Sequence, residues 1–300
     1  MKFLIFFLIF VITCQEIYFY DLNDAAHFKY YQNNKYILYW YEWWYANLKT
    51  EKNIIIMFFT IGNLNNPFLS LVGAFVSILD DDIEKITIAS CIDCYLDYKK
   101  CNVSIAGNRF YEKNGIYIIK YNKGDFSLIM KIYPYGMPFG NQTMLNKWQF
   151  TAWYVSVPYG KGEAWIKYKG KEYYVKGKAY HDHNWGISKK MKWDWGEFSC
   201  KEFAIIYGIA ESRGGLYFVD NNSYFFFKIE IEYLEWKRIN GIRKPAKLHL
   251  YGKDVDLFIE LERAYTIWYK PYLLGKAYGN IKINGKLYEI NSIGFYEHHY

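Results

Sequence analysis

The chain has 300 residues, of which 52% are hydrophobic, 22% charged and 22% aromatic. This composition excludes a disordered protein, and six prolines are too few for a proline-rich linker. The net charge of +7 suggests nucleic acid at first, but the lysines alternate singly with aromatic residues, as in Lys167–Lys171, and form no basic run. A solvated strand face explains this spacing better than a phosphate-binding track, so we expect no nucleic-acid partner.

The chain begins with a short apolar segment. Phe3–Ile12 is an uninterrupted apolar run, about half the ~20 residues that a membrane-spanning helix needs. We interpret residues 1–14 as a signal peptide or membrane anchor, and Thr13-Cys14 resembles the cleavage site of a bacterial-type lipoprotein. The protein is then exported or associated with a membrane through this segment. The alternative is a cytoplasmic protein in which the run forms a buried first strand.

The cysteine pattern is compatible with export. If Cys14 is lipidated or removed, four cysteines remain, an even number suited to disulfides in an oxidising compartment. Cys91-x-x-Cys94, with Cys101 close behind, could instead begin a zinc site, but no fourth ligand follows at the spacing of a zinc finger. We therefore expect a disulfide among these three residues.

Beyond the leader, short apolar or alternating runs recur, and hardly any run has a period of 3.6 long enough for a helix. The runs are Asn53–Ile61, Phe68–Leu79, Lys85–Ala89, Gly115–Tyr121, Asp125–Tyr133, Trp148–Val157, Phe203–Ile209, Tyr224–Tyr233 and Val255–Leu261. They are separated by turn residues, notably Asn114-Gly115, Gly214-Gly215, Asp220-Asn221-Asn222, Asn240-Gly241 and Asn284-Gly285. Many short strands with frequent turns predict an all-β fold, an antiparallel sandwich or barrel.

An internal repeat divides this β structure in two. Shifting Lys161–His183 by 115 positions places it on Lys276–His298, with identities that include Gly170 with Gly285 and His183 with His298. Each copy is a predicted hairpin that ends in a carboxylate followed by histidine. The repeat predicts two tandem β domains, 23–186 and 187–300, with roughly 4–10 strands each.

Three segments are rich in groups that could carry chemistry: Trp40–Tyr45, with Glu42 among five aromatic residues; Tyr180–Gly186; and Glu297-His298-His299. On a strand, His181 and His183 share one face while Asp182 takes the other. Two imidazoles on one face could bind a metal with a distant ligand. Alternatively, Asp182 points into an apolar cavity and acts as a general acid. The third interpretation is a purely structural one, in which these groups join the two domains through buried hydrogen bonds. We favour the acid, with no metal or other cofactor.

These segments also resemble a known family. Glu42–Leu48 resembles the opening Glu-Trp-Trp-Tyr strand of the carotenoid 1,2-hydratase (hydroxyneurosporene synthase) and AttH-like family, and Gly177–Gly186 is similar to its central Asp-His-Asn-Trp-Gly signature. Trp193–Gly196 and Gly294–His298 resemble later strands of the family, in the same order. The resemblance implies two lipocalin-like domains, and it places Asp182 where the hydratases have the aspartate suspected of acid catalysis.

We therefore expect a cofactor-free hydratase or cyclase-type enzyme, a lyase or isomerase, that acts on a hydrophobic isoprenoid- or lipid-like substrate at the domain junction. The expected catalytic residues are Asp182 as the proton donor and His181 or His183, which sets the protonation state of Asp182 through a hydrogen bond. The expected substrate-binding residues are Glu42, Trp44, Tyr180, Asn184, Trp185, Trp195, Glu297 and His298. The alternative is a non-catalytic, exported lipocalin-like carrier of an apolar ligand. An enzyme needs a carboxylate or histidine that reaches the cavity, whereas a carrier needs only a polar rim.

Overall fold

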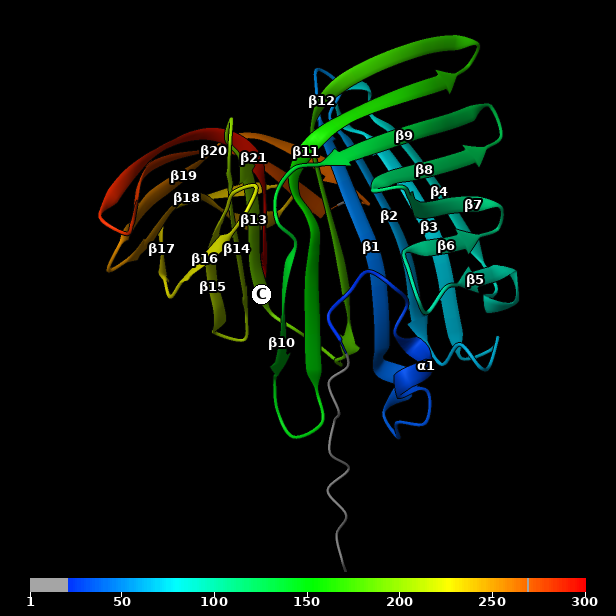
Figure 1. The fold of residues 1–300 in the computed structure, drawn as a ribbon. Helices are drawn as coiled ribbons and strands as arrows, with labels where there is room; N and C mark the ends of the chain where they lie inside the picture. Colours follow the sequence, from blue (N-terminus) through cyan, green and yellow to red (C-terminus); the bar gives the residue numbers. More distant parts are fainter. Residues whose placement is uncertain (1–20, 269) are drawn as a thin grey trace, which may run out of the picture.

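The computed structural model describes residues 21–268 and 270–300, so the predicted leader and Cys14 lie outside the described residues. Antiparallel strands form two sheets that stand side by side (Figure 1). The described helices are short: α1 (Phe28–Tyr31) and the 3₁₀ turns η1 (Ile37–Tyr39), η2 (Leu79–Asp81) and η3 (Cys91–Asp93). None of the helices in this part of the chain is long and apolar enough to cross a membrane. The predicted all-β class, with two tandem barrel-type units, is confirmed.

The first sheet curves into a nearly closed barrel. Its strands are β1 (Trp40–Lys49), β2 (Ile54–Gly62), β3 (Ser70–Ile78), β4 (Ile83–Ala89), β5 (Cys94–Leu96), β6 (Asn102–Ile105), β7 (Asn108–Lys113), β8 (Ile116–Lys123), β9 (Phe126–Pro134), β10 (Phe139–Met144), β11 (Phe150–Tyr168) and β12 (Lys171–Ile187). They are paired in the order β4-β3-β2-β1-β12-β11-β9-β8-β7-β6-β5, and β10 pairs with β11 outside this path.

The second sheet forms a half-barrel. Its strands are β13 (Trp193–Ser199), β14 (Ala204–Ala210), β15 (Arg213–Val219), β16 (Tyr224–Phe227), β17 (Glu230–Ile239), β18 (Ile242–Gly252), β19 (Val255–Ile267), β20 (Lys270–Ile283) and β21 (Lys286–His299). Their order is β16-β15-β14-β13-β21-β20-β19-β18-β17. The chain passes from one sheet to the other between Ile187 and Trp193, while the domain limits 23–186 and 187–300 stay a prediction.

The two repeated hairpins hold equivalent places in the two sheets. The first copy belongs to the β11–β12 hairpin and the second to the β20–β21 hairpin. In each sheet the last strand pairs with the first, β12 with β1 and β21 with β13, so that β12 and β21 are interior strands of their sheets. Sequence similarity between the hairpins therefore corresponds to similar positions in the fold.

The predicted turns are mostly where the structure has them. Asn114-Gly115, Asn240-Gly241 and Asn284-Gly285 join hairpin strands, and all six residues have positive φ, the conformation that asparagine and glycine tolerate best. Gly214-Gly215 was predicted as a turn but lies inside β15, and the turn is at Glu211-Ser212, two residues that also have positive φ. Side-chain type alone did not indicate that non-glycine residues would take this conformation.

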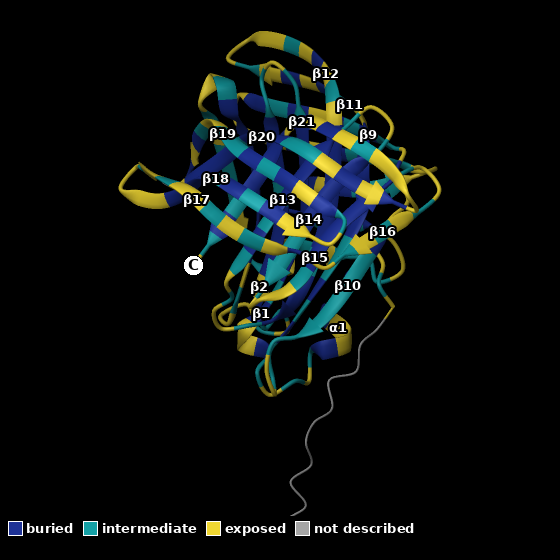
Figure 2. Ribbon diagram, turned by 90° about the vertical axis from the view of Figure 1, so that its left-hand side faces the viewer, coloured by how far each residue is buried: buried dark blue, intermediate teal, exposed yellow. Residues whose placement is uncertain are grey.

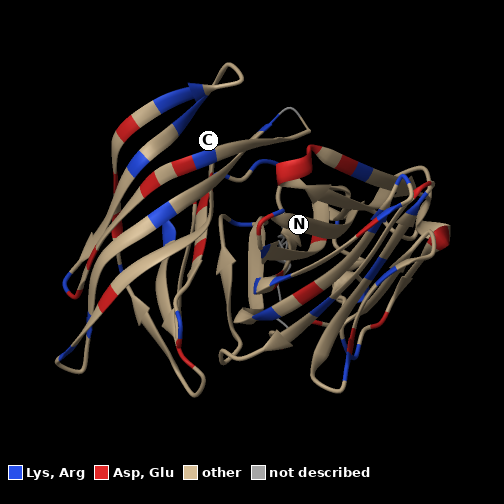
Figure 3. Ribbon diagram, turned by 90° about the horizontal axis from the view of Figure 1, so that it is seen from above, with Lys and Arg blue, Asp and Glu red and all other residues tan. Residues whose placement is uncertain are grey.

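Hydrophobic cores fill each sheet's concave side, and a further aromatic-rich cluster joins the two sheets. That third cluster includes Tyr45, Phe75 and Tyr180 from the first sheet and Tyr272 and Phe295 from the second. Buried residues are concentrated where the strands of the two sheets overlap in Figure 2. Charged residues of both signs are interspersed along the outer strands (Figure 3). The junction between the sheets is thus an apolar, aromatic layer.

Candidate functional site

A cavity of about 340 Å³ lies between the two sheets. Five tryptophans line it, two from the first sheet and three from the second sheet and its β19–β20 turn: Trp43, Trp153, Trp193, Trp195 and Trp268. Among the titratable residues at its wall are Asp182, Arg213, Lys270, Glu297 and His299. A concave, largely apolar site with a few polar groups is the usual form of a small-molecule site.

Asp182 is the polar group of the first sheet that stands out in this cavity. Its side chain is only 4% exposed. The Trp153 Nε1–H and the Tyr180 hydroxyl donate hydrogen bonds to Oδ2 at 2.9 and 2.8 Å, and Asn184 Nδ2 donates to Oδ1 at 3.2 Å. Burial raises the pKa of Asp182 to about 7, against the hydrogen bonds from Trp153 and Tyr180, which lower it. Because two donors occupy Oδ2, the proton of the neutral acid belongs on Oδ1, beside Asn184.

Strand alternation divides the predicted site into two groups. Tyr180, Asp182 and Asn184 share the face of β12 that meets the second sheet, while His181 and His183 point into the first barrel, as the alternation predicted. Trp185 lies on this inner face too, and Glu42 and Trp44 reach it from the neighbouring β1. The expectation of one pocket that includes all of these residues was therefore wrong.

The second sheet contributes Trp195 and Glu297 to the cavity, as expected. Trp195 contacts the rings of Tyr45 and Tyr180, and Trp193 Nε1 donates to Glu297 Oε2 at 3.1 Å. Burial raises the pKa of Glu297, while the Trp193 hydrogen bond and nearby lysines oppose this. His299 lies in one of the three segments singled out in the sequence but was not among the expected site residues. Its ring stacks on Trp193 with 4.0 Å between ring centroids.

His298 does not reach the cavity, which corrects a second expectation. Its ring faces the inside of the second half-barrel, where Nδ1 lies 2.8 Å from Asp194 Oδ1 and the ring contacts Tyr233 and Trp236. His183 and His298 are therefore equivalent in the repeat, but each faces the interior of its own sheet. The repeat is real as a structural feature and does not bring the two histidines together.

The expected link between Asp182 and a neighbouring imidazole is also absent from the described residues. His181 instead pairs with Asp24, with 2.8 Å between Nε2 and Oδ2, and His183 Nε2 lies 3.1 Å from Glu42 Oε1. Successive strand residues point in opposite directions, so neither ring can reach the Asp182 carboxyl. The donors to Asp182 are Trp153, Tyr180 and Asn184, of which the sequence analysis had selected Tyr180 and Asn184.

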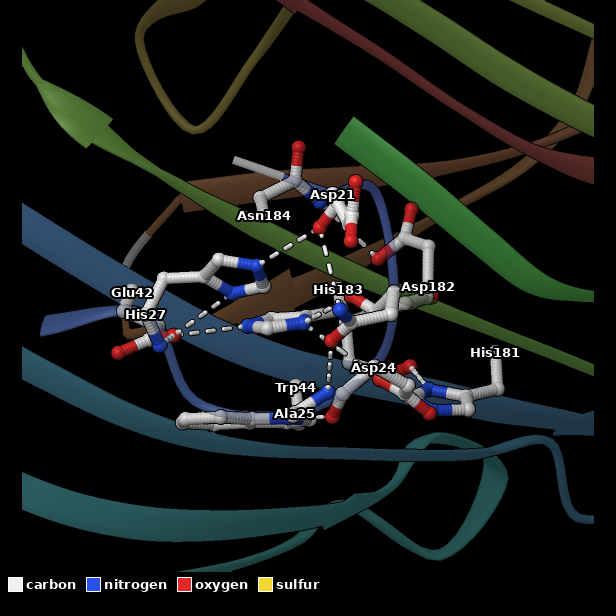
Figure 4. Close-up of polar contacts among 12 residues, drawn as sticks. Asp21, Asp24, Ala25, His27, Glu42, Trp44, His181, Asp182, His183 and Asn184 are labelled. Atoms are coloured by element: carbon white, nitrogen blue, oxygen red, sulfur yellow. Dashed lines mark hydrogen bonds and ion pairs between the residues drawn. The ribbon is translucent and has the colours of Figure 1, made fainter. Parts of the chain in front are cut away.

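The inner group is a buried polar network (Figure 4). It joins Asp24, His27 and Glu42 to His181 and His183, and each of these side chains is less than a tenth exposed. Burial by itself lowers the pKa of His181, but Asp24 more than offsets this and raises it. His181 in turn lowers the pKa of the Asp24 carboxyl, although burial alone would raise it. Asp24 and His181 therefore form an ion pair inside the barrel.

The cysteines do not form the expected disulfide. Cys91, Cys94, Cys101 and Cys200 are all free in the described part of the chain. Cys101 is buried, and burial raises the pKa of its thiol well above the usual value. The even count of cysteines was compatible with disulfides but could not show whether the side chains meet.

Comparisons with known proteins extend the fold assignment. No protein-family model and no curated protein sequence matches the chain. Among solved structures, a putative AttH from Nitrosomonas europaea has a TM-score of 0.68 at 15% identity, covering 92% of this chain and 94% of its own. Kievitone hydratase from Nectria haematococca has a TM-score of 0.57 at 12% identity, with 87% and 88% covered. The chain therefore has the lipocalin-like two-barrel fold of these proteins, as the sequence motifs implied.

Proposed function

We propose that the protein is a hydratase- or cyclase-type enzyme that acts by acid catalysis on a hydrophobic, isoprenoid- or lipid-like substrate. The observation that carries this proposal is the position of the Asp182 carboxyl, held by three donors in the wall of a tryptophan-lined cavity. A carboxylic acid in an apolar setting keeps its proton near neutral pH, and Asp182 has such a setting. The fold shared with kievitone hydratase supports this reaction class.

The chemistry follows from the groups at the cavity. Asp182 transfers its proton from Oδ1 to one carbon of a C=C bond, and a cation forms at the other carbon. The aromatic faces of Trp43, Trp153 and Trp195 stabilise that charge. In hydration, water adds to the cation and returns a proton to Asp182. In cyclisation, a second double bond of the same substrate attacks the cation, and the final loss of a proton restores the acid.

The test uses the purified protein and a panel of probes: farnesol, geranylgeraniol and squalene. Wild-type protein should convert at least one probe, adding the mass of water or forming a ring, and in heavy water the product should contain deuterium at the protonated carbon. Asp182→Asn should lower turnover by ~10²–10⁴-fold but still bind the probe. Glu163→Gln, a surface carboxylate bonded to Tyr133 and Tyr174, is the matched control and should keep full activity.

Two results would contradict the proposal. Binding of a probe without any conversion by wild-type protein would favour the carrier. Unchanged turnover in Asp182→Asn with a lower melting temperature would make the carboxyl a structural link between the sheets.

Native mass spectrometry of protein purified from its own membranes would identify the class of any ligand that remains bound.

A further inference from the structure

The buried network inside the first barrel contains three side chains arranged like metal ligands. One ligand atom from each of His27, Glu42 and His183 lies within 4.8 Å of the other two. Glu42 Oε1 is 3.6 Å from the His27 nitrogen and 3.1 Å from the His183 nitrogen. Ligand atoms around a tetrahedral zinc ion, at bond lengths of about 2.0–2.2 Å, are separated by about 3.3–3.6 Å. The observed spacing is close to that of a preformed site.

In each imidazole, the hydrogen bond made by the nitrogen farther from Glu42 leaves the other nitrogen available to bind a metal. His27 Nε2 lies 3.3 Å from the Asp21 carbonyl oxygen, and His183 Nδ1 lies 3.3 Å from the Asn23 carbonyl oxygen. A carbonyl can only accept, so these two nitrogens can carry the ring protons when the opposite nitrogens bind a metal. The opposite nitrogens, both near Glu42, then present lone pairs. Zinc-binding histidines typically make this kind of hydrogen bond to a backbone carbonyl.

Two buried polar atoms without hydrogen-bond partners lie at the same point, which supports a metal site independently of the ligand spacing. His27 Nδ1 and Glu42 Oε2 are buried without a hydrogen-bond partner among the described residues, and their side chains are 1% and 0% exposed. An imidazole nitrogen and a carboxylate oxygen that are buried without partners are costly unless a positive charge lies between them. A single proton can serve only one imidazole, whereas a divalent ion serves all three groups.

The surroundings hold the two rings in place. The His27 ring stacks on Trp185 with 3.7 Å between centroids and 5° between planes, and the His183 ring stacks on Trp44 with 4.5 Å and 16°. The Glu42 carboxylate also accepts the backbone N–H of His27 at 2.6 Å. Figure 4 shows both imidazoles pointing at Glu42. Ligands held in this way lose little conformational freedom when a metal binds.

We propose that His27, Glu42 and His183 form a structural zinc site inside the first barrel, with Glu42 Oε2 or a water molecule as the fourth ligand. Two imidazoles and one carboxylate are a ligand set that zinc favours. No metal was expected from the sequence, and the metal site that was considered paired His183 with His181 rather than with His27. Since the site lies on the opposite face of β12 from Asp182, this proposal is independent of the proposed function.

The first test is metal binding by the wild-type protein. Protein stripped with a chelator and titrated with ZnCl₂ should retain one equivalent after gel filtration, and its melting temperature should rise with zinc concentration. Titration with CoCl₂ should give visible absorption bands of a four- or five-coordinate ion, without a thiolate charge-transfer band. Retention of less than a tenth of an equivalent would overturn the proposal and leave a network held by protons alone.

Variants locate the site. His27→Gln is the first choice, because His27 precedes β1 and its loss leaves the sheet hydrogen bonds intact. It should weaken zinc binding by at least ~100-fold, while His249→Gln, which removes a surface histidine paired with Asp256, should bind as wild type does. A thiolate–cobalt band would place the ion instead among Asp24, Cys101 and His181, the neighbouring group of possible ligands, and would contradict the proposal. Equal binding by His27→Gln and wild type would also contradict it.

Discussion

Asp182 and His183 are consecutive residues of β12, yet their side chains lie on opposite sides of the first sheet. The Asp182 carboxyl accepts the Trp153 indole N–H at the cavity between the sheets, whereas the His183 ring faces Glu42 inside the barrel. One strand thus supplies two separate sites, a cavity wall and an interior polar network. Substitutions at the two positions should consequently have different effects.

Gly208 packs so closely against Trp153 that a larger side chain at this position should displace the indole from the cavity wall. A Cβ atom at Gly208 would lie 2.6 Å from the Trp153 ring, nearer than such atoms approach in folded proteins. Gly208→Ala should therefore displace the indole and break its hydrogen bond to Asp182. We expect weaker binding of an apolar probe and ~10-fold or greater loss of turnover, measured by probe fluorescence and by product formation.

Trp153→Phe provides the matched comparison for this prediction. It keeps an aromatic ring but removes the N–H donor, so it should cause a similar loss of turnover. If Gly208→Ala acts through Trp153, the double variant should lose no more than the more impaired single variant. Additive losses would show that Gly208 acts by another route.

The Lys49–Glu197 pair should contribute to the attachment of the two sheets. Lys49 of β1 reaches Glu197 of β13, with 2.5 and 2.6 Å between Nζ and the two carboxylate oxygens, and Asn47 Nδ2 donates to the same carboxylate. Both charges are buried, so removing one partner leaves the other uncompensated. We expect Glu197→Gln to lower the free energy of unfolding by about 3–5 kcal/mol in urea titrations.

The double variant Lys49→Met with Glu197→Gln distinguishes the cost of an unpaired buried charge from the cost of altered packing. It removes both charges and should regain much of the lost stability, because no buried charge is then left unpaired. A double variant as unstable as Glu197→Gln alone would mean that packing, rather than the unpaired lysine, causes the loss.

Because the cysteines of the described residues are free thiols, the stability of the protein should not depend on a reducing agent. The melting temperature should be the same with and without dithiothreitol. Alkylation with iodoacetamide in denaturant, without prior reduction, should modify Cys91, Cys94, Cys101 and Cys200, as located by peptide mapping. In the folded protein Cys101 should react slowest, because it is buried and its thiol pKa is raised. A peptide pair joined through Cys91, Cys94 or Cys101 would restore the disulfide hypothesis.

Protonation of His299 should account for part of the pH dependence of the protein's stability. Burial, helped by Lys244 and Lys270, lowers the pKa of His299 to about 3, whereas an unfolded chain has a value of about 6.5. Between these values the unfolded state binds a proton that the folded state does not, so this residue makes the protein less stable as the pH falls. The melting temperature of His299→Gln should therefore fall less than that of wild type between about pH 7.5 and 5. Parallel curves for the two proteins would refute this assignment.

Local sequence patterns were sufficient for the all-β class, for most hairpin turns and for the opposite directions of Asp182 and its two neighbouring histidines. These features depend on short-range geometry: side chains alternate along a strand, and Asn-Gly pairs tolerate positive φ. The repeat around Gly170 and Gly285 also identified two hairpins that hold equivalent places in the two sheets.

Only the tertiary structure decided which face of β12 meets the second sheet and which side chains gather on each face. Trp153 joins Asp182 because β11 pairs with β12, and Glu297 and His299 of β21 reach the same cavity because the two sheets pack together. Asp24 and His27 precede the first strand, where no periodicity marks them, and they meet His181 and His183 only because the segment before β1 folds against the barrel interior. Contacts between residues more than a hundred positions apart depend on strand register and sheet packing, which leave no local pattern in the sequence.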